Sequence, residues 1–144
     1  MPTPIDDFLA DMLPSYLAAE HALCGGDPAP RSDTWSHADP VTLFGAAQPV
    51  RQGWDEVSNV FRALADRFDE LRDYRLELLA AGVDRELGYT VGLEHKTVVV
   101  DGEPATYTLR VTSVYRREDG RWKVVHRHGD HHVEPAAAAD GASS

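Results

Sequence analysis

Apolar residues near the N-terminus recur at helical spacing. Between residues 5 and 17 they lie three or four positions apart, and this pattern predicts an amphipathic helix. Pro14 is expected to kink or restart this helix, and the pair Gly25-Gly26 is expected to end it. Residues 27–38 are loop-like, with room for one short helical turn.

A second helix is predicted after two short strands. Residues 41–44 and 49–52 can each form a strand of a few residues, and Gly53 then opens the helix. Its apolar stripe runs over residues 57–71, and charged residues occupy the opposite face.

The period changes to two from residue 73 onward, which predicts four β-strands. Asp101-Gly102 and Asp119-Gly120 are strong signals for two-residue hairpin turns, because type I′ turns need positive φ at both central residues. Helices followed by an antiparallel meander predict an α+β fold. The predicted strands lie near 73–83, 87–100, 103–117 and 121–133.

The two turns also predict which side chains share a face of the sheet, because each two-residue loop sets the pairing register. Around Asp119-Gly120 the register places Ser113 opposite His126 and Val111 opposite His128. One face is then expected to carry Thr90, Gly92, Glu94, Tyr107, Leu109, Val111, Ser113, Tyr115, Val124, His126 and His128. The other is expected to carry Tyr89, Val91, Leu93, His95, Thr108, Arg110, Thr112, Val114, Val125 and Arg127.

Composition narrows the class of protein. The 144 residues fit one domain, which we place at residues 1–134, with a flexible tail at 135–144. The formal net charge of −10 argues against nucleic acid or an anionic membrane as a partner. Cys24 is the only cysteine, so an intrachain disulfide is excluded. Without a basic leader or an apolar run of about 20 residues, we expect a cytoplasmic protein.

Two segments carry a family resemblance. LRVTSVYRREDGRWKVVHRHGD (109–130) resembles the C-terminal hairpin of the nuclear transport factor 2-like superfamily, and is similar to that of the calcium/calmodulin-dependent kinase II association domain. DPVTLFGAAQPVRQGWDEVSNVF (39–61) resembles SnoaL-like and ketosteroid-isomerase-like members. The resemblance implies a cone-shaped, cystatin-like fold, in which a curved antiparallel sheet wraps around a long N-terminal helix. It also implies a pocket at the open end and a homodimer.

At the positions that match the known active sites of these relatives, this sequence has different residue types. Phe44 falls where the isomerase has its carboxylate base, and Ser113 falls where it has its oxyanion-hole acid. Gly92 and Ser113 fall at two positions where the association domain has pocket arginines. His126 and His128 match the histidines of that domain's hairpin.

His126 and His128 are the candidate catalytic residues. They are two apart on a strand and titrate near neutral pH, so both can exchange protons with a ligand on their face. Glu94 and Ser113 are expected to orient the ligand from that same face. The alternatives are structural histidines that hold the sheet to the helices, and a Glu94 that lies at the rim or pairs with Lys96.

Other candidate ligand contacts surround this face. Glu20 lies one helical turn beyond Tyr16 on the apolar stripe, and Trp35 and His37 can stack on a flat ligand, unless the tryptophan is a core or dimer anchor. The full set of ligand-binding candidates is Tyr16, Glu20, Trp35, His37, Phe44, Glu94, Tyr107, Val111, Ser113 and Tyr115.

The histidine-rich end of the chain suggests a metal site at first sight. Alternation along the strand, however, separates His131 from His128 and His132, so we predict neither a metal site nor a cofactor.

Two functions remain open from the sequence. The first is a pocket protein for a small hydrophobic or carboxylate-bearing ligand, with acid–base catalysis of an isomerase, cyclase or dehydratase type as an option. The second is a non-catalytic association module. In either case a homodimer is expected through the sheet face that bears Val91, Leu93 and Val114, with Arg110 and Arg127 at its edge.

Overall fold

The structure is a computed structural model that describes residues 2–46 and 49–133. The tail predicted at 135–144 therefore lies outside the described residues. Three helices precede a long antiparallel meander, as the α+β prediction requires. In chain order the elements are α1 (Pro4–Cys24), α2 (Ala29–Asp33), β1 (Thr42–Phe44), β2 (Arg51–Gln52), α3 (Trp54–Arg67), β3 (Phe68–Val83), β4 (Leu87–Val100), β5 (Glu103–Glu118) and β6 (Arg121–His131).

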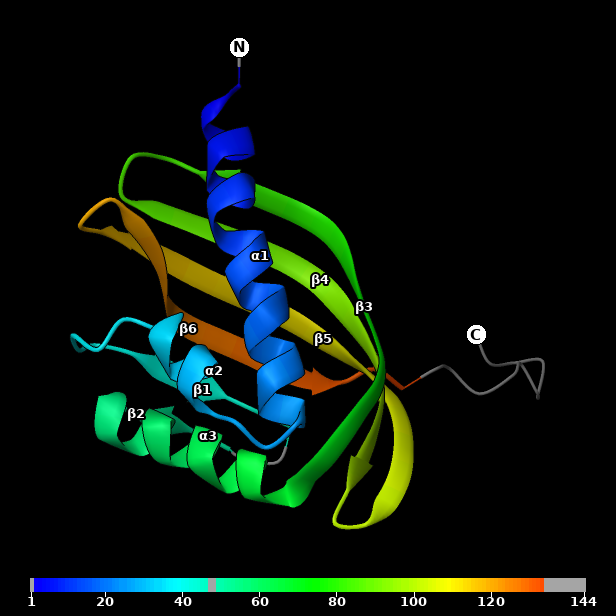
Figure 1. Cartoon of the computed structure of the whole chain (residues 1–144). Coiled ribbons are helices and arrows are strands. Elements are labelled where there is room, and N and C mark those ends of the chain that lie inside the picture. The colour runs from blue at the N-terminus through cyan, green and yellow to red at the C-terminus, as the bar shows by residue number, and fades with distance from the viewer. Residues whose placement is uncertain (1, 47–48, 134–144) are drawn as a thin grey trace, which may run out of the picture.

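One curved sheet of six strands forms the body of the molecule, in the order β2-β1-β6-β5-β4-β3. Strand β1 pairs with β6 in parallel, and the other pairs are antiparallel. The sheet bends around α1, and α2 and α3 lie on the same concave side, at the end formed by β1 and β2 (Figure 1). None of the described elements covers the convex face (Figure 1). The predicted cone is confirmed.

Helix α1 begins at a capping box and ends at a glycine. The Thr3 side chain accepts a hydrogen bond from the backbone of Asp6, whose carboxylate accepts one from the backbone of Thr3 in return. The helix is continuous through Pro14, so the predicted restart does not occur, and Gly25 caps its end as expected. Helix α3 begins after Gly53, whose φ of 89° suits glycine.

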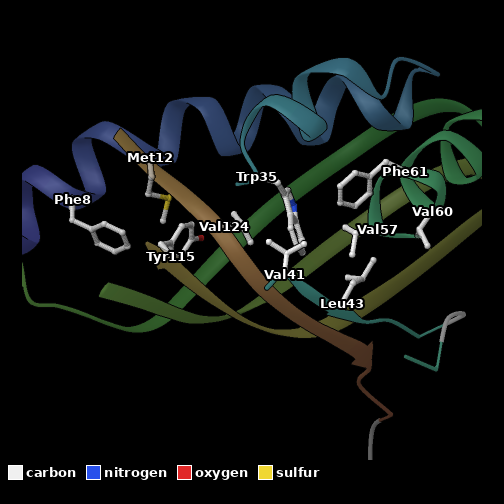
Figure 2. Close-up of a cluster of buried hydrophobic side chains, with 10 residues drawn as sticks. All are labelled: Phe8, Met12, Trp35, Val41, Leu43, Val57, Val60, Phe61, Tyr115 and Val124. Atoms are coloured by element: carbon white, nitrogen blue, oxygen red, sulfur yellow. The ribbon is translucent and has the colours of Figure 1, made fainter. Parts of the chain in front are cut away.

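The hydrophobic core fills the space between the helices and the concave face (Figure 2). Phe8 and Met12 from α1 meet Tyr115 of β5 at one end, and Phe61 of α3 packs against Trp35 at the other. The same cluster contains Val41, Leu43, Val57, Val60 and Val124. Trp35 is therefore a core anchor.

Both predicted hairpin turns are present, with positive φ at Asp101, Gly102, Asp119 and Gly120. The register of β4 on β5 is also as predicted, since Thr90 pairs with Ser113, Gly92 with Val111 and Glu94 with Leu109.

The register of β6 on β5 is as predicted only near the turn. Tyr115 pairs with Val124, but Val114 then pairs with His126, so Val125 is an extra residue in β6. Such a β-bulge reverses the alternation of every following side chain. Ser113 consequently faces Arg127, and Val111 faces Gly129.

Because of the bulge, three residues lie on the opposite face of the sheet from the one predicted. His126 and His128 lie on the convex face and not beside Glu94, and Arg127 lies on the concave face, where it is buried. The expectation that Arg127 contributes to an interface on the convex face is therefore wrong.

Candidate functional site

A cavity of about 250 Å³ opens between α3 and the concave face of the sheet. Most of its wall is apolar, and its charged side chains come from five different elements. The lining residues are Glu20, Leu23, Arg31, Leu43, Gly45, Ala46, Val60, Phe61, Leu64, Arg67, Phe68, Lys96, Val100, Tyr107, Leu109, Arg127, Gly129 and His131.

Five buried charged side chains form a connected network at one side of this cavity. Two are carboxylates, from Glu20 and Glu94, and three are cations, from Arg31, Lys96 and Arg127. Three positive minus two negative charges leave one net positive charge in the network. Burying an unbalanced charge is costly, because the charge loses its hydration without gaining a full counter-ion.

Glu94 is completely buried at the centre of the network. Arg127 binds it through both terminal nitrogens, with Nη2 at 2.9 Å from Oε1 and Nη1 at 3.2 Å from Oε2. The Tyr16 hydroxyl donates to Glu94 and accepts from Arg127 Nη1 at 2.9 Å. Lys96 Nζ lies 3.5 Å from Glu94 Oε1. The pairing of Glu94 with Lys96 therefore occurs, but in the interior and not at a rim.

Glu20 joins the other two cations. Its Oε1 accepts a hydrogen bond from Arg31 Nη2, and its Oε2 accepts one from Lys96 Nζ. Cys24, one turn further along α1, points its sulfur to the same carboxylate at 3.6 Å. Burial and the negative charge of Glu20 raise the pKa of the Cys24 thiol to about 12, so this cysteine is a poor nucleophile.

Both buried carboxylates remain ionised. Burial opposes ionisation of Glu20, but the charges of Lys96, Arg31 and Arg127 outweigh it and hold its pKa well below the ordinary value. Burial likewise opposes ionisation of Glu94, and Arg127 and Lys96 outweigh it, so its pKa is lowered as well. A carboxylate with a lowered pKa is a weak base, which disfavours proton abstraction by either residue.

Four of the sequence-predicted residues meet at this site. Glu20 and Tyr107 line the cavity, and Tyr16 and Glu94 belong to the ion network behind it. Burial raises the pKa of the Tyr107 hydroxyl.

Three further candidates lie on the concave face but outside the cavity. Val111 and Tyr115 are buried next to a void of about 10 Å³ beneath α1. Tyr115 places its hydroxyl 3.1 Å from the Thr90 hydroxyl, and Ser113 is buried against Arg127.

The remaining candidates lie away from the cavity. His37 is exposed and stacks on Trp54 with ring centroids 4.0 Å apart. Phe44 lies edge-on to His126 and His128 on the convex side, because the parallel pairing of β1 with β6 turns Phe44 outward and Leu43 inward. His126 Nδ1 lies 2.7 Å from the Thr42 hydroxyl. The geometric reason for assigning catalysis to His126 and His128 is therefore removed.

Sequence reasoning named Lys96 as a possible partner of Glu94, but it did not place Arg31 or Arg127 in a buried network. The position of Lys96 could be predicted locally, because it follows Glu94 by two positions on a strand and therefore lies on the same face. Arg127 would have required knowledge of the bulge. Arg31 comes from the five-residue helix α2, and nothing local in the sequence indicates that this segment folds against α1.

No group of three or more His, Cys, Asp or Glu side chains is placed to hold a metal ion among residues 2–46 and 49–133. Over the same described ranges, no helix is long and apolar enough to cross a bilayer.

The fold and the cavity define a class of cone-shaped α+β proteins with a ligand-sized pocket between sheet and helices. A family model for the SnoaL-like domain matches residues 19–130. The chain therefore belongs to the SnoaL-like family, within the nuclear transport factor 2-like superfamily, as the sequence resemblance implied.

Solved structures with the same fold include proteins of different description. A candidate dehydratase of the NTF2-like family from Streptomyces avermitilis has a TM-score of 0.78 at 19% identity, over 92% of this chain and 100% of that one. A candidate calcium/calmodulin-dependent kinase type II association domain from Thiobacillus denitrificans has a TM-score of 0.71 at 19% identity, over 92% and 98%.

A ketosteroid isomerase-like protein from Erwinia carotovora atroseptica has a TM-score of 0.72 at 15% identity, over 90% of this chain and 99% of that one. Identities this low establish the fold alone. A comparison with curated proteins found no match.

Proposed function

We propose that this protein binds a small organic anion with an apolar body in the cavity between α3 and the sheet. The observation that carries the proposal is the excess of one buried cation, at the side of a cavity whose remaining walls are largely apolar. A bound monoanion balances that charge, and its hydrocarbon part occupies the apolar wall. A carboxylate-bearing ligand has this chemistry.

Binding has more support than acid–base catalysis. The two carboxylates of the network are locked in ion pairs with low pKa values, and His126 and His128 lie on the other face of the sheet. Similarity to proteins described as a dehydratase candidate or as isomerase-like is compatible with either a binding or a catalytic role.

Selective binding of carboxylates is the test of this proposal. We expect benzoate and hexanoate to raise the melting temperature, and benzamide and hexanamide, which match them in shape without the charge, to have no effect. Isothermal titration calorimetry then gives the dissociation constants.

Lys96→Met is the diagnostic variant because it leaves two buried cations and two buried carboxylates. We expect it to weaken carboxylate binding at least about tenfold, because the network then has no excess positive charge for the anion to balance. Arg110→Met removes the same charge from the convex face and serves as the control. Equal responses to acids and amides would contradict the proposal.

We further propose a homodimer through the convex face of the sheet. Tyr89 is 46% exposed there, next to the half-buried Val91, Leu93 and Val114, and no described element covers these side chains. An uncovered apolar sheet face of this kind favours self-association. Arg110 lies on the same face and is paired with Asp130 at 2.7 and 2.8 Å.

Light scattering after size exclusion tests the dimer at micromolar concentration. We expect a dimeric mass for the wild type and a monomeric mass for Leu93→Glu, which places a charge in the proposed interface. Leu17→Glu adds the same charge at a partly exposed position of α1 and should remain dimeric. A monomeric wild type would refute the interface.

A further inference from the structure

The three buried cations differ in how many of their donors are used. Arg127 engages both terminal nitrogens with Glu94 and Tyr16, and Lys96 contacts both Glu20 and Glu94. Arg31 uses only Nη2, toward Glu20, within the part of the chain that the structure describes. Its Nε and Nη1 groups therefore remain available to a ligand, and Arg31 is itself a lining residue of the cavity.

The charge of Arg31 is also the least compensated of the three. Burial lowers the pKa of Arg31, and the neighbouring Glu20 does not fully offset this effect. The pKa of Lys96 and of Arg127, by contrast, is raised, because their carboxylate partners outweigh burial. An additional anion is therefore most favourable beside Arg31.

The surroundings of Arg31 indicate the body of the ligand. Its guanidinium carbon lies over the Phe61 ring, 5.4 Å from the centroid, and Phe61 lines the same cavity. Phe68 and Tyr107 contribute two more aromatic rings to the wall. Aromatic side chains bind an aromatic ligand more strongly than a saturated one of the same size, through edge and stacking contacts.

We propose that Arg31 binds the carboxylate of an aryl monocarboxylic acid, whose ring lies against Phe61. This rests on the proposed function and deepens it by naming the binding residue and the ligand class. A guanidinium presents its N–H groups as a planar fork that matches the two oxygens of a carboxylate, which a lysine ammonium cannot do. One net positive charge in the network matches one carboxylate and not two.

Titration calorimetry with four probes tests the ligand class on the wild type. Benzoate is expected to bind, and cyclohexanecarboxylate, which lacks the aromatic ring, is expected to bind several-fold more weakly. Phthalate, with two carboxylates, and benzamide, with none, are expected to bind at least tenfold more weakly than benzoate. Equal affinity for benzoate and cyclohexanecarboxylate would overturn the aryl assignment.

Arg31→Lys tests the binding residue, because it retains the charge and the pairing with Glu20 but removes the fork. We expect benzoate to bind about 10- to 100-fold more weakly to R31K, the range for a hydrogen bond to a charged group. Arg110→Lys makes the same exchange on the convex face, where the guanidinium pairs with Asp130, and should bind like wild type.

Two further outcomes separate this inference from the proposed function. If the wild type binds no carboxylate, both fail. If benzoate binds and Lys96→Met weakens it while R31K does not, the anion site stands and the role of Arg31 is wrong. Phe61→Leu keeps all five charges of the network and provides a second variant, in which the preference for benzoate over cyclohexanecarboxylate should be lost.

Discussion

Replacing Glu94 with glutamine is expected to lower the free energy of unfolding by about 3–5 kcal/mol. The substitution keeps the size of the side chain but removes the carboxylate that Arg127 binds through two nitrogens and that Lys96 approaches to 3.5 Å. Both cations are buried, so neither recovers its hydration when the partner charge is lost. Urea denaturation followed by tryptophan fluorescence measures the change.

The matched control for this variant lies on the surface. Asp130→Asn breaks the ion pair with Arg110, whose side chain is 60% exposed, and should cost less than about 1 kcal/mol. A similar loss of stability in the two variants would show that the buried network is not the stabilising unit.

Stability is also expected to fall steeply in acid. The pKa values of Glu20 and Glu94 are lower in the folded protein than in the unfolded chain, so the unfolded chain binds more protons as pH falls. Their contribution is complete above the unfolded value near 4.5 and is lost as pH falls below it toward the folded values. In that window each carboxylate contributes a slope of up to about 1.4 kcal/mol per pH unit.

Urea titrations between pH 6 and pH 3 measure this slope. Glu94→Gln removes one of the two titrating groups and should show a shallower decline than wild type. Asp66→Asn, at an exposed position of α3, should keep the wild-type slope. A Glu94→Gln profile parallel to that of the wild type would mean that the shifted carboxylate does not control acid stability.

The sequence predicted most of the sheet because its signals are local. Asp101-Gly102 and Asp119-Gly120 adopt the positive φ angles that two-residue hairpin turns need. The register predicted from the first turn is correct along all of β4 and β5, including the pairing of Glu94 with Leu109. Glu94 and Tyr107 were therefore placed on the correct face without any tertiary information.

The candidate site was predicted less completely, because one extra residue in β6 decides which side chains of that strand face the cavity. The bulge at Val125 has no glycine or proline to announce it, and it exchanges the faces of Arg127 and its two histidine neighbours. A strand reading His-Arg-His allows either the histidines or the arginine to face inward. Glu94, two strands away, has a buried carboxylate that binds a cation. This contact joins residues that are distant in sequence, and it favours the inward position for the arginine.

The sequence by itself determined the α+β class, the hairpins, the cone and the family, since periodicity, turn residues and motif wording are properties of short segments. Tertiary structure alone decided which charges meet. Glu20 from α1 and Arg31 from α2 are far along the chain from Lys96 of β4 and from Arg127 of β6. They form one network because buried charges must find partners wherever the fold brings them together.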